Sequence, residues 1–458
     1  MADEAIDRSL SELTREAGDA PGKTRHIVVQ NEIGDAVATW LGQSHPGKLD
    51  ILVCDENTKA AAAESLAARL QLSGRRSQLL TLPTREGEDH VVCDEAIIDA
   101  LTEQLRQMPD ANAIAVGAGT INDIVKMATF KLGRGYQSVA TAASMNGYTS
   151  AIAAVLSRGV KRTLPAQQAE AVFADPGVIG RAPAYLNRAG FGDLLSKPYS
   201  NADWLLSHYV RGVAYEERPA KLLDEAYVAL LERASAVGRG EASGIGTLTR
   251  TILLSGFTMA IAGTSAPASG GEHLVSHYWD MEQHCHDEAL FGLHGTQVGV
   301  ATRMSAMLFE RLVSLAQDDI DVDAAVKTRG DASWLETLGA RHERLTPAVV
   351  EEVRAQITAK QKHGDALHEE LTAVRERWPE IRAGLEAVLI PSARMGEVLA
   401  AAGAADRPSA LKVDRAHAVR TLRVCREIRS RYVALDLIAD LGHLDGWAAE
   451  VVDAVEAA

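Results

Sequence analysis

Residues 111–123 read Ala-Asn-Ala-Ile-Ala-Val-Gly-Ala-Gly-Thr-Ile-Asn-Asp. The apolar run 111–116 is typical of a parallel strand that is buried on both faces, and it precedes a glycine-rich turn. A helix is predicted after the turn, from Thr120 to about Phe130. A glycine-rich turn between a strand and a helix lets phosphates approach the backbone and meet the positive end of the helix. The stretch therefore predicts a site for a phosphate-bearing cofactor.

Strand and helix signals alternate on both sides of this stretch, from about His26 to about Ile179. Such alternation predicts a parallel sheet covered by helices, with the loops after its strands presented to a nucleotide. The other predicted strands are 26–30, 49–55, 77–82 and 136–142, and the other predicted helices are 58–72 and 96–108.

Strand signals end at about Tyr185, and apolar residues then recur at helical spacing. The clearest helical runs are 221–237, 245–261, 298–315 and 347–377, whereas 317–346 predicts loops and short helices. We therefore predict an α/β N-terminal domain with a Rossmann-like parallel sheet over residues 1–184. An all-helical domain that binds metal and substrate is predicted over residues 185–458.

Composition narrows the class of protein. The chain has 458 residues, enough for two domains with substantial cores. Its formal net charge of -15 disfavours a nucleic-acid partner, because phosphate backbones need a basic face. The four cysteines show no CxxC spacing, which favours a cytoplasmic protein, and the acidic start does not resemble a signal peptide. No uncharged apolar run approaches the length of a membrane span, so none is expected.

Three side chains are candidates for a metal site: Asp193, His273 and His294. One carboxylate and two imidazoles suit a borderline-soft divalent ion with one position left open, as in catalytic zinc sites. His277 lies one helical turn after His273 and shares its face. The spacing is not HExxH, so a metalloprotease is not indicated.

Two further histidines, His284 and His286, lie in the polar stretch 281–288. They are alternative contacts to the metal, because this stretch also resembles a surface metal-binding tract. A solvated loop before the helix at His294 is the simpler account.

The chain resembles the sn-glycerol-1-phosphate dehydrogenases, in the superfamily of glycerol dehydrogenases, iron-type alcohol dehydrogenases and dehydroquinate synthases. The motifs that carry the resemblance are GAGTINDIVK (117–126), TAASMNGYTS (141–150), AGFGD (189–193), Asp203-Trp204, GEHLVSH (271–277) and HGTQVG (294–299). They follow one another in the family's order and spacing. The tail beyond about residue 310 shows no motif.

The resemblance implies a dehydroquinate synthase-like fold and a role for each matching residue. The implied ligands of one divalent metal, zinc or alternatively nickel, are Asp193, His273 and His294. The implied catalytic residues are these three and His277. The implied contacts to NAD(H) or NADP(H) are Asp55, Gly117, Gly119, Thr120, Asp123, Thr141, Ser144 and Ser150. The implied contacts to the substrate are Asp123, Asn146, His273 and Lys197.

Three details distinguish the chain within the superfamily. Dehydroquinate synthases have a Glu at the position of Asp193, and iron-type alcohol dehydrogenases have a His at the position of Lys197. The loss of that fourth protein ligand favours zinc over iron. The string Ser-Met-x-Gly-Tyr points to the glycerol-1-phosphate branch, although that branch usually has Asp where this chain has Asn146.

The implied activity is the reduction of dihydroxyacetone phosphate to sn-glycerol 1-phosphate by NAD(P)H, which belongs to phospholipid metabolism. His277 or a water on the metal would supply the proton, and Lys161, Arg162 and Lys197 are candidates for the phosphate. Asp55 followed by Glu56 favours NADH, since an acid repels a 2′-phosphate.

A homo-oligomer is expected. The alternatives are a dehydrogenase of another polyol or polyol phosphate, and a non-catalytic nucleotide-binding protein.

Overall fold

The computed structural model describes residues 2–18, 20–84, 90–157, 160–286 and 288–457, with Val160 and Lys161 described by their backbone only. Contacts between Cα atoms divide the chain into two compact units. Unit 1 comprises Met1–Leu194 and Lys221–Gly263, and unit 2 comprises Leu195–Ala220 and Thr264–Ala458. The predicted domain boundary at residue 184 stays a prediction.

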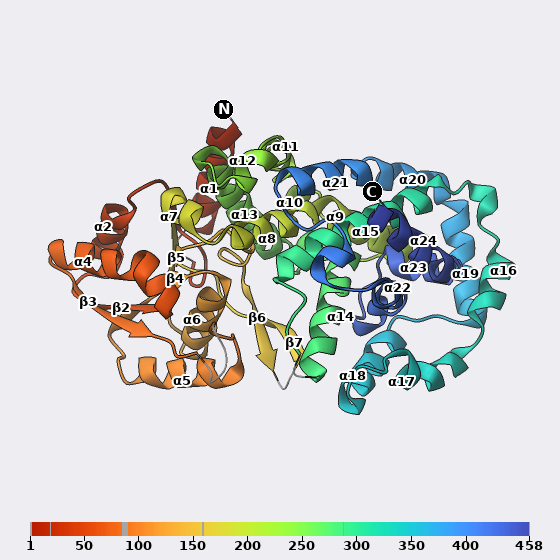
Figure 1. The fold of residues 1–458 in the computed structure, drawn as a ribbon, viewed down its shortest axis with the longest axis horizontal. Helices are drawn as coiled ribbons and strands as arrows, with labels where there is room; N and C mark the ends of the chain where they lie inside the picture. Colours follow the sequence, from red (N-terminus) through yellow and green to blue (C-terminus); the bar gives the residue numbers. More distant parts are fainter. Residues whose placement is uncertain (1, 19, 85–89, 158–159, 287, 458) are drawn as a thin grey trace. The chain divides into compact units, whose positions relative to one another are not determined.

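The sheet of unit 1 has six strands in the order β1-β8-β5-β4-β2-β3, and every neighbouring pair is parallel. Figure 1 labels β2, β3, β4 and β5 of this sheet. The strands are β1 (His26–Val29), β2 (Leu49–Cys54), β3 (Arg76–Thr81), β4 (Ala111–Gly117), β5 (Tyr136–Ala140) and β8 (Ala171–Ala174). All of β4 and β5 is buried, as expected of central parallel strands. The predicted parallel sheet is confirmed.

The strand order changes direction between β2 and β4. The chain passes from β2 to β3 on one side and from β4 to β5 on the other, although β2 and β4 are hydrogen-bonded neighbours. Ligands of open α/β sheets bind at the carboxyl ends of the strands at such a switch point. Val53 pairs with Ala115, so Asp55 and the Gly117 turn lie at the same level of this edge.

Helices connect these strands and complete unit 1. They are α1 (Ala2–Ala17), α2 (Gly34–Ser44), α3 (Glu56–Thr58), the π-helix η1 (Lys59–Ala63), α4 (Glu64–Leu72), α5 (Glu95–Arg106), α6 (Gly119–Lys131), α7 (Pro176–Arg181), α8 (Ala184–Leu195), α11 (Asp224–Glu232), α12 (Ala234–Gly238) and α13 (Ala242–Ala262). The predicted helix 58–72 is therefore interrupted by one π turn. The core packs residues of α2 and α4 against β2, β4, β5 and β8.

One hairpin was not predicted. Strands β6 (Ile152–Ser157) and β7 (Val160–Pro165) pair antiparallel and form a separate sheet of their own. Burial in β6 alternates along the strand, which is the pattern of a ribbon that is covered on one face. The sequence predicts only parallel strands in this region, and alternation over six residues is a weak signal for an antiparallel hairpin.

Helix α13 is the one helix of the described residues that is long and apolar enough to cross a membrane. Its most apolar window is 78% buried within the protein, and α13 packs against α1, α7, α11 and α12. Burial in the core of unit 1 accounts for its apolar sequence.

Unit 2 contains only helices in its described residues, as predicted for the C-terminal part. They are α9 (Lys197–Arg211), η2 (Ala266–Ala268), α14 (Gly271–Cys285), α15 (His294–Ser314), η3 (Gln317–Asp319), α16 (Val322–Arg329), η4 (Ala332–Thr337), α17 (Leu338–Arg341), α18 (Pro347–Thr358), α19 (Gly364–Glu376), α20 (Trp378–Glu386), α21 (Ser392–Ala401), η5 (Pro408–Leu411), α22 (Arg415–Val424), η6 (Cys425–Ile428), α23 (Ala434–Asp440) and α24 (Leu444–Ala457), and the short α10 (Arg218–Lys221) joins the two units in sequence. The predicted run 347–377 is two helices, α18 and α19.

A buried ionic network fixes the segment between η6 and α23. The ammonium group of Lys360 donates to the carbonyls of Arg426 (2.7 Å) and Arg431 (3.0 Å) and to Oδ2 of Asp436 (2.7 Å). Arg426 is 1% exposed and its guanidinium also binds Asp436. Buried charges are tolerated only when they are paired in this way. The network therefore gives residues 429–433 a defined backbone position.

Candidate functional site

The glycine turn after β4 is closely packed. A Cβ atom on Gly117 would lie 2.5 Å from Cβ of Ile121, and one on Gly119 would lie 2.7 Å from Cγ of Met145. No side chain caps α6 at Ala118, and the first turn of the helix contains no acid. The turn thus presents an α-helix N-terminus without a competing carboxylate, which is the electrostatic requirement for binding a phosphate. The half-buried Thr120 lies in the same turn.

Asp55 follows β2 at the neighbouring position of the same edge. Its Oδ1 accepts hydrogen bonds from the backbone N–H (2.7 Å) and the hydroxyl (2.8 Å) of Thr58, so it also caps α3. An acid at the end of the second strand is the residue that holds an adenosine ribose in dinucleotide sites. Capping uses one carboxylate oxygen, and Oδ2 remains for a ribose hydroxyl.

Asp123 lies on α6, one helical turn after Gly119. Its carboxylate accepts from Ala154 N–H (3.0 Å) and from the Asn122 amide (3.1 Å), and it lies 3.4 Å from the ammonium group of Lys126. Burial lowers the pKa of Lys126, and the Asp123 charge opposes that effect. These contacts give Asp123 a structural role in addition to the predicted contact with cofactor or substrate.

Lys126 was not singled out from the sequence. Its ammonium group donates to the carbonyls of Gly147 (2.6 Å) and Ile152 (2.8 Å) and lies 3.5 Å from the hydroxyl of Ser150. Lys126 and Ser150 are both fully buried. The two side chains therefore hold the loop that contains the predicted cofactor contacts.

The remaining predicted contacts of unit 1 lie in the same loop. Thr141 is buried and its N–H donates to the carbonyl of Gly117 (3.2 Å), which ties the loop to the glycine turn. Ser144 and Asn146 are half-buried, and the Asn146 amide donates to the hydroxyl of Ser255 (3.4 Å). The structure thus brings Thr141, Ser144 and Asn146 together around one turn.

Helix α8 carries Asp193 and packs directly on this loop. Oδ1 of Asn187 accepts from Ala143 N–H (3.0 Å), and a Cβ atom on Gly190 would overlap the Ala143 carbonyl. Asn187 and Gly190 are one helical turn apart, and Asp193 follows one turn later near the same face. Asp193 is 2% exposed. A buried carboxylate at this position requires a counter-charge or hydrogen-bond donors.

Three imidazoles gather in unit 2. The ring centres of His273 and His294 are 5.2 Å apart, those of His277 and His294 5.4 Å, and those of His273 and His277 6.3 Å. Two imidazoles that bind one tetrahedral zinc through bonds of about 2.0 Å place their ring centres about 5 Å apart. His273 and His294 already have that spacing.

A chain of hydrogen bonds fixes the tautomer of His294. The Gln297 amide donates to Oδ1 of buried Asp280 (3.0 Å), which directs its carbonyl oxygen toward Ser276. The Ser276 hydroxyl donates its single proton to that oxygen (2.6 Å), so it must accept from Nδ1–H of His294 (2.9 Å). His294 therefore carries a lone pair at Nε2, as a metal ligand must.

His273 is fixed in the same tautomer by a carboxylate. Its Nδ1 lies 2.8 Å from Oε1 of Glu272, which has no proton to give when ionised, so Nδ1–H donates and Nε2 keeps its lone pair. Glu272 is fully buried, and Asp203 approaches it across Gly270. Burial and the Glu272 charge raise the pKa of Asp203 to about 8. Asp203 also accepts from Gly271 N–H and Ala434 N–H (2.6 Å each), which holds the start of α14.

His277 has the opposite tautomer. The Arg429 guanidinium donates to Nδ1 of His277 (3.3 Å). Nδ1 thus carries the lone pair in the neutral ring, and the proton lies on Nε2. Hydrogen bonding separates the three imidazoles into two with an Nε2 lone pair and one with an Nε2 proton.

The other predicted residues have different surroundings. Helix α14 continues to Cys285, so His284 is on the helix and not in a loop, whereas His286 is exposed. Lys197 is buried, and its ammonium group donates to the carbonyl of Ala268 (3.1 Å). Arg162 lies in β7, and the side chain of Lys161 is outside the described residues.

No group of three or more His, Cys, Asp or Glu side chains in the described residues is drawn together as a complete metal site. Asp193 belongs to unit 1 and the histidines to unit 2. The structure brings His273 and His294 together, and the role of Asp193, His273 and His294 as metal ligands stays a prediction.

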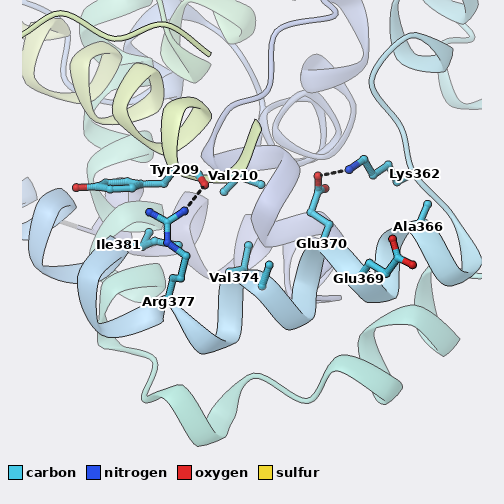
Figure 2. A pocket seen from close by; sticks show the side chains of 10 residues that line it. Tyr209, Val210, Lys362, Ala366, Glu369, Glu370, Val374, Arg377 and Ile381 are labelled. Atoms are coloured by element: carbon cyan, nitrogen blue, oxygen red, sulfur yellow. Dashed lines mark hydrogen bonds and ion pairs between the residues drawn. The ribbon is translucent and has the colours of Figure 1, made fainter. Parts of the chain in front are cut away.

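A pocket of unit 2 lies between α9 and α19, and none of the predicted site residues lines it (Figure 2). Two of its charged wall residues bind other wall residues: Lys362 binds Glu370 (2.7 Å), and Arg377 donates to the carbonyl of Tyr209 (3.1 Å). The pocket gives no indication of a catalytic function.

Comparison with known proteins first defines the class. A sequence model of the iron-containing alcohol dehydrogenases matches residues 28–183. A probable glycerol dehydrogenase from Sinorhizobium meliloti 1021 has a similar structure, with a TM-score of 0.58 and 15% identity over 93% of this chain and 98% of that chain. Glycerol dehydrogenase from Schizosaccharomyces pombe gives a TM-score of 0.58 at 14% identity over 94% and 92% of the two chains. The fold is thus the dehydroquinate synthase-like fold of these dehydrogenases.

Sequence similarity then defines the family. Glycerol-1-phosphate dehydrogenase (NAD(P)+) from Bacillus subtilis is 32% identical over 78% of this chain and 91% of its own length. The protein of the same name from Pyrococcus horikoshii is 36% identical over 48% of this chain and 62% of its own length. The chain belongs to the glycerol-1-phosphate dehydrogenase family.

The packing of α8 yields a prediction about stability. Replacing Gly190 by Ala places a methyl group on the Ala143 carbonyl, and we expect overpacking to lower the free energy of unfolding by about 1–3 kcal/mol or more. The matched control is Gly42→Ala in α2, where nothing lies within 4 Å and a helical alanine should stabilise by about 0.5–1 kcal/mol. Denaturant unfolding of both variants measures the difference. An unchanged midpoint for Gly190→Ala would contradict the contact.

Proposed function

We propose that this chain reduces dihydroxyacetone phosphate to sn-glycerol 1-phosphate with NADH or NADPH as hydride donor. The observation that carries the proposal is the histidine cluster of α14 and α15, in which hydrogen bonds prepare two imidazoles as metal ligands and a third as a proton donor. Relatives that are named glycerol-1-phosphate dehydrogenase favour this substrate over an unphosphorylated polyol.

Unit 1 would hold the dinucleotide. The pyrophosphate would lie against Gly117, Gly119 and Thr120 at the N-terminus of α6, where no acid competes. Asp55 would bind the adenosine ribose from the neighbouring strand end, and we propose that it favours NADH. The nicotinamide half would contact the loop that Lys126 holds, through Thr141, Ser144 and Ser150.

The metal ligands that we propose are Asp193, His273 and His294. The residues fit a divalent ion with an open position, because both imidazoles keep the Nε2 lone pair and have the spacing of two zinc ligands. We propose zinc, with nickel as the alternative. When bound, such an ion polarises the substrate's carbonyl oxygen and stabilises the charge that develops there.

The protein's own groups would complete the reaction. Arg429 leaves the proton of neutral His277 on Nε2, so this nitrogen would donate a hydrogen bond to the substrate's carbonyl oxygen as hydride reaches the carbonyl carbon, and water would replace the proton that the alcohol takes. Asp123 and Asn146 would contact the substrate from unit 1, and Lys197 is a further candidate. We also propose that the enzyme is a cytoplasmic homo-oligomer.

The ligand assignment predicts a loss of metal in one variant and not in another. His273→Ala should lower the affinity for the divalent ion by more than about 100-fold. The variant lacks a direct ligand, and even removing a residue that only hydrogen-bonds a ligand lowers metal affinity by about 10–100-fold. The control is His368→Ala, an exposed histidine paired with Asp323 on the surface. Metal analysis after dialysis measures both. Undiminished metal with full activity in His273→Ala would refute the assignment.

The reaction itself is tested by kinetics with two ketones and two cofactors. A site built for a phosphate uses the anion's binding energy at the reacting centre, so dihydroxyacetone phosphate should have a much higher kcat/KM than dihydroxyacetone. NADH should be preferred over NADPH because of Asp55. The product, analysed on a chiral phase, should be sn-glycerol 1-phosphate.

Two results would contradict these expectations. Equal kcat/KM for the two ketones would favour a dehydrogenase of plain polyols. A clear preference for NADPH would show that Asp55 does not face the ribose.

A further inference from the structure

Arg429 and Arg431 lie beside the histidine cluster, in a part of the chain where the sequence shows no motif. They belong to the short segment between η6 and α23, and both are half-buried. Arg429 donates to His277, whose ring is 5.4 Å from that of His294. A guanidinium group is therefore within a few ångströms of the imidazoles that would bind and protonate the substrate.

The second guanidinium is held close to the first. Arg431 donates to the carbonyl of Ser269 (2.5 Å) and to the hydroxyl of Ser265 (2.9 Å). Burial lowers the pKa of Arg431, and the nearby charge of Arg429 lowers it further, while Asp203 and Glu272 raise it. The two arginines are thus close enough for their charges to repel each other.

The backbone of this segment is fixed, so the guanidinium groups are preorganised. Ser430 N–H donates to Oε1 of Gln356 (3.0 Å), and the Arg431 carbonyl accepts from Lys360 (3.0 Å). Ala434 N–H donates to Oδ1 of Asp203 (2.6 Å). A charged group on a rigid segment loses little entropy when it binds a ligand.

A third cation contacts the turn that precedes α14. Lys197 donates to the carbonyl of Ala268, and Arg431 donates to the carbonyl of Ser269, which is the next residue. Two cations therefore contact this turn, and Arg429 contacts His277 of α14.

We propose that Arg429, supported by Arg431, binds the phosphate group of the substrate. This inference rests on the proposed function and adds the residues that select a phosphorylated ketone. The phosphate of such a ketone is only a few bonds from its carbonyl, so a phosphate site must lie next to the groups that bind and protonate the carbonyl oxygen. A guanidinium has five N–H donors in a planar fork that matches the oxygens of a phosphate.

The experiment compares the full-length, metal-loaded wild type with Arg429→Gln, Arg429→Lys and a control, Arg415→Gln. Arg415 pairs with Asp453 on the surface. With Arg429→Gln, kcat/KM should fall about 100-fold more for dihydroxyacetone phosphate than for dihydroxyacetone, because losing the bond to His277 affects both ketones and the charged contact to a phosphate is lost with the first ketone alone. Arg429→Lys should recover part of the loss, and the control should match the wild type.

Inhibition by inorganic phosphate separates this inference from the proposed function. Phosphate should inhibit the reduction of dihydroxyacetone by the wild type, and the inhibition constant should rise at least about tenfold in Arg429→Gln. A higher inhibition constant in Arg429→Gln supports a phosphate contact of Arg429, whichever ketone the wild type prefers. A wild type without preference for the phosphorylated ketone would refute the proposed function only.

Two results would overturn the inference. Equal inhibition of the wild type and Arg429→Gln by phosphate would exclude a phosphate contact. An equal loss of kcat on both ketones, with a changed pH profile, would show that Arg429 acts only by orienting His277. Circular dichroism and the melting temperature of each variant verify that it is folded.

Discussion

The hydrogen bonds to Nδ1 of three histidines determine which ring nitrogens of unit 2 carry a lone pair and which carry a proton. Glu272 and the Ser276–Gln297–Asp280 chain each accept, directly or through a hydroxyl, from a ring nitrogen, so His273 and His294 keep a lone pair at Nε2. Arg429 donates instead, and His277 keeps a proton there. The same side chain thus has two different tautomers within one cluster, because its partners differ in whether they donate or accept.

A second constraint shapes unit 1. The strand order of its sheet changes direction between β2 and β4. The turn after β4 lies at the carboxyl ends of these strands, and its Gly117 and Gly119 leave no room for a Cβ atom. Lys126 and Asn187 tie the loop 141–150 to α6 and α8. The proposed cofactor and ligand residues of this unit are therefore held by one connected set of contacts, even where each residue is far from the others in sequence.

The sequence predicted the parallel sheet and the helical C-terminal part, because these depend on local periodicity. Short motifs also singled out His273 and His294, whose rings lie 5.2 Å apart, and their role as metal ligands stays a prediction. The sequence did not predict the β6–β7 hairpin, since alternating burial over six residues is a weak signal beside longer apolar strands. Ser276 and Gln297 lie within the motifs 271–277 and 294–299, but their roles depend on hydrogen bonds between α14 and α15. No sequence motif indicates a functional role for Arg429, because it contacts His277, which is 152 residues away in the chain.

Nitrogen NMR of protein labelled with ¹⁵N-histidine tests this arrangement most directly. At a pH above about 8, where imidazoles are neutral, the metal-free protein should show His273 and His294 protonated at Nδ1 and His277 protonated at Nε2. Single His→Gln variants assign the three signals. A proton at Nε2 of His273 or His294, or at Nδ1 of His277, would contradict the division of the cluster into two ligands and one proton donor.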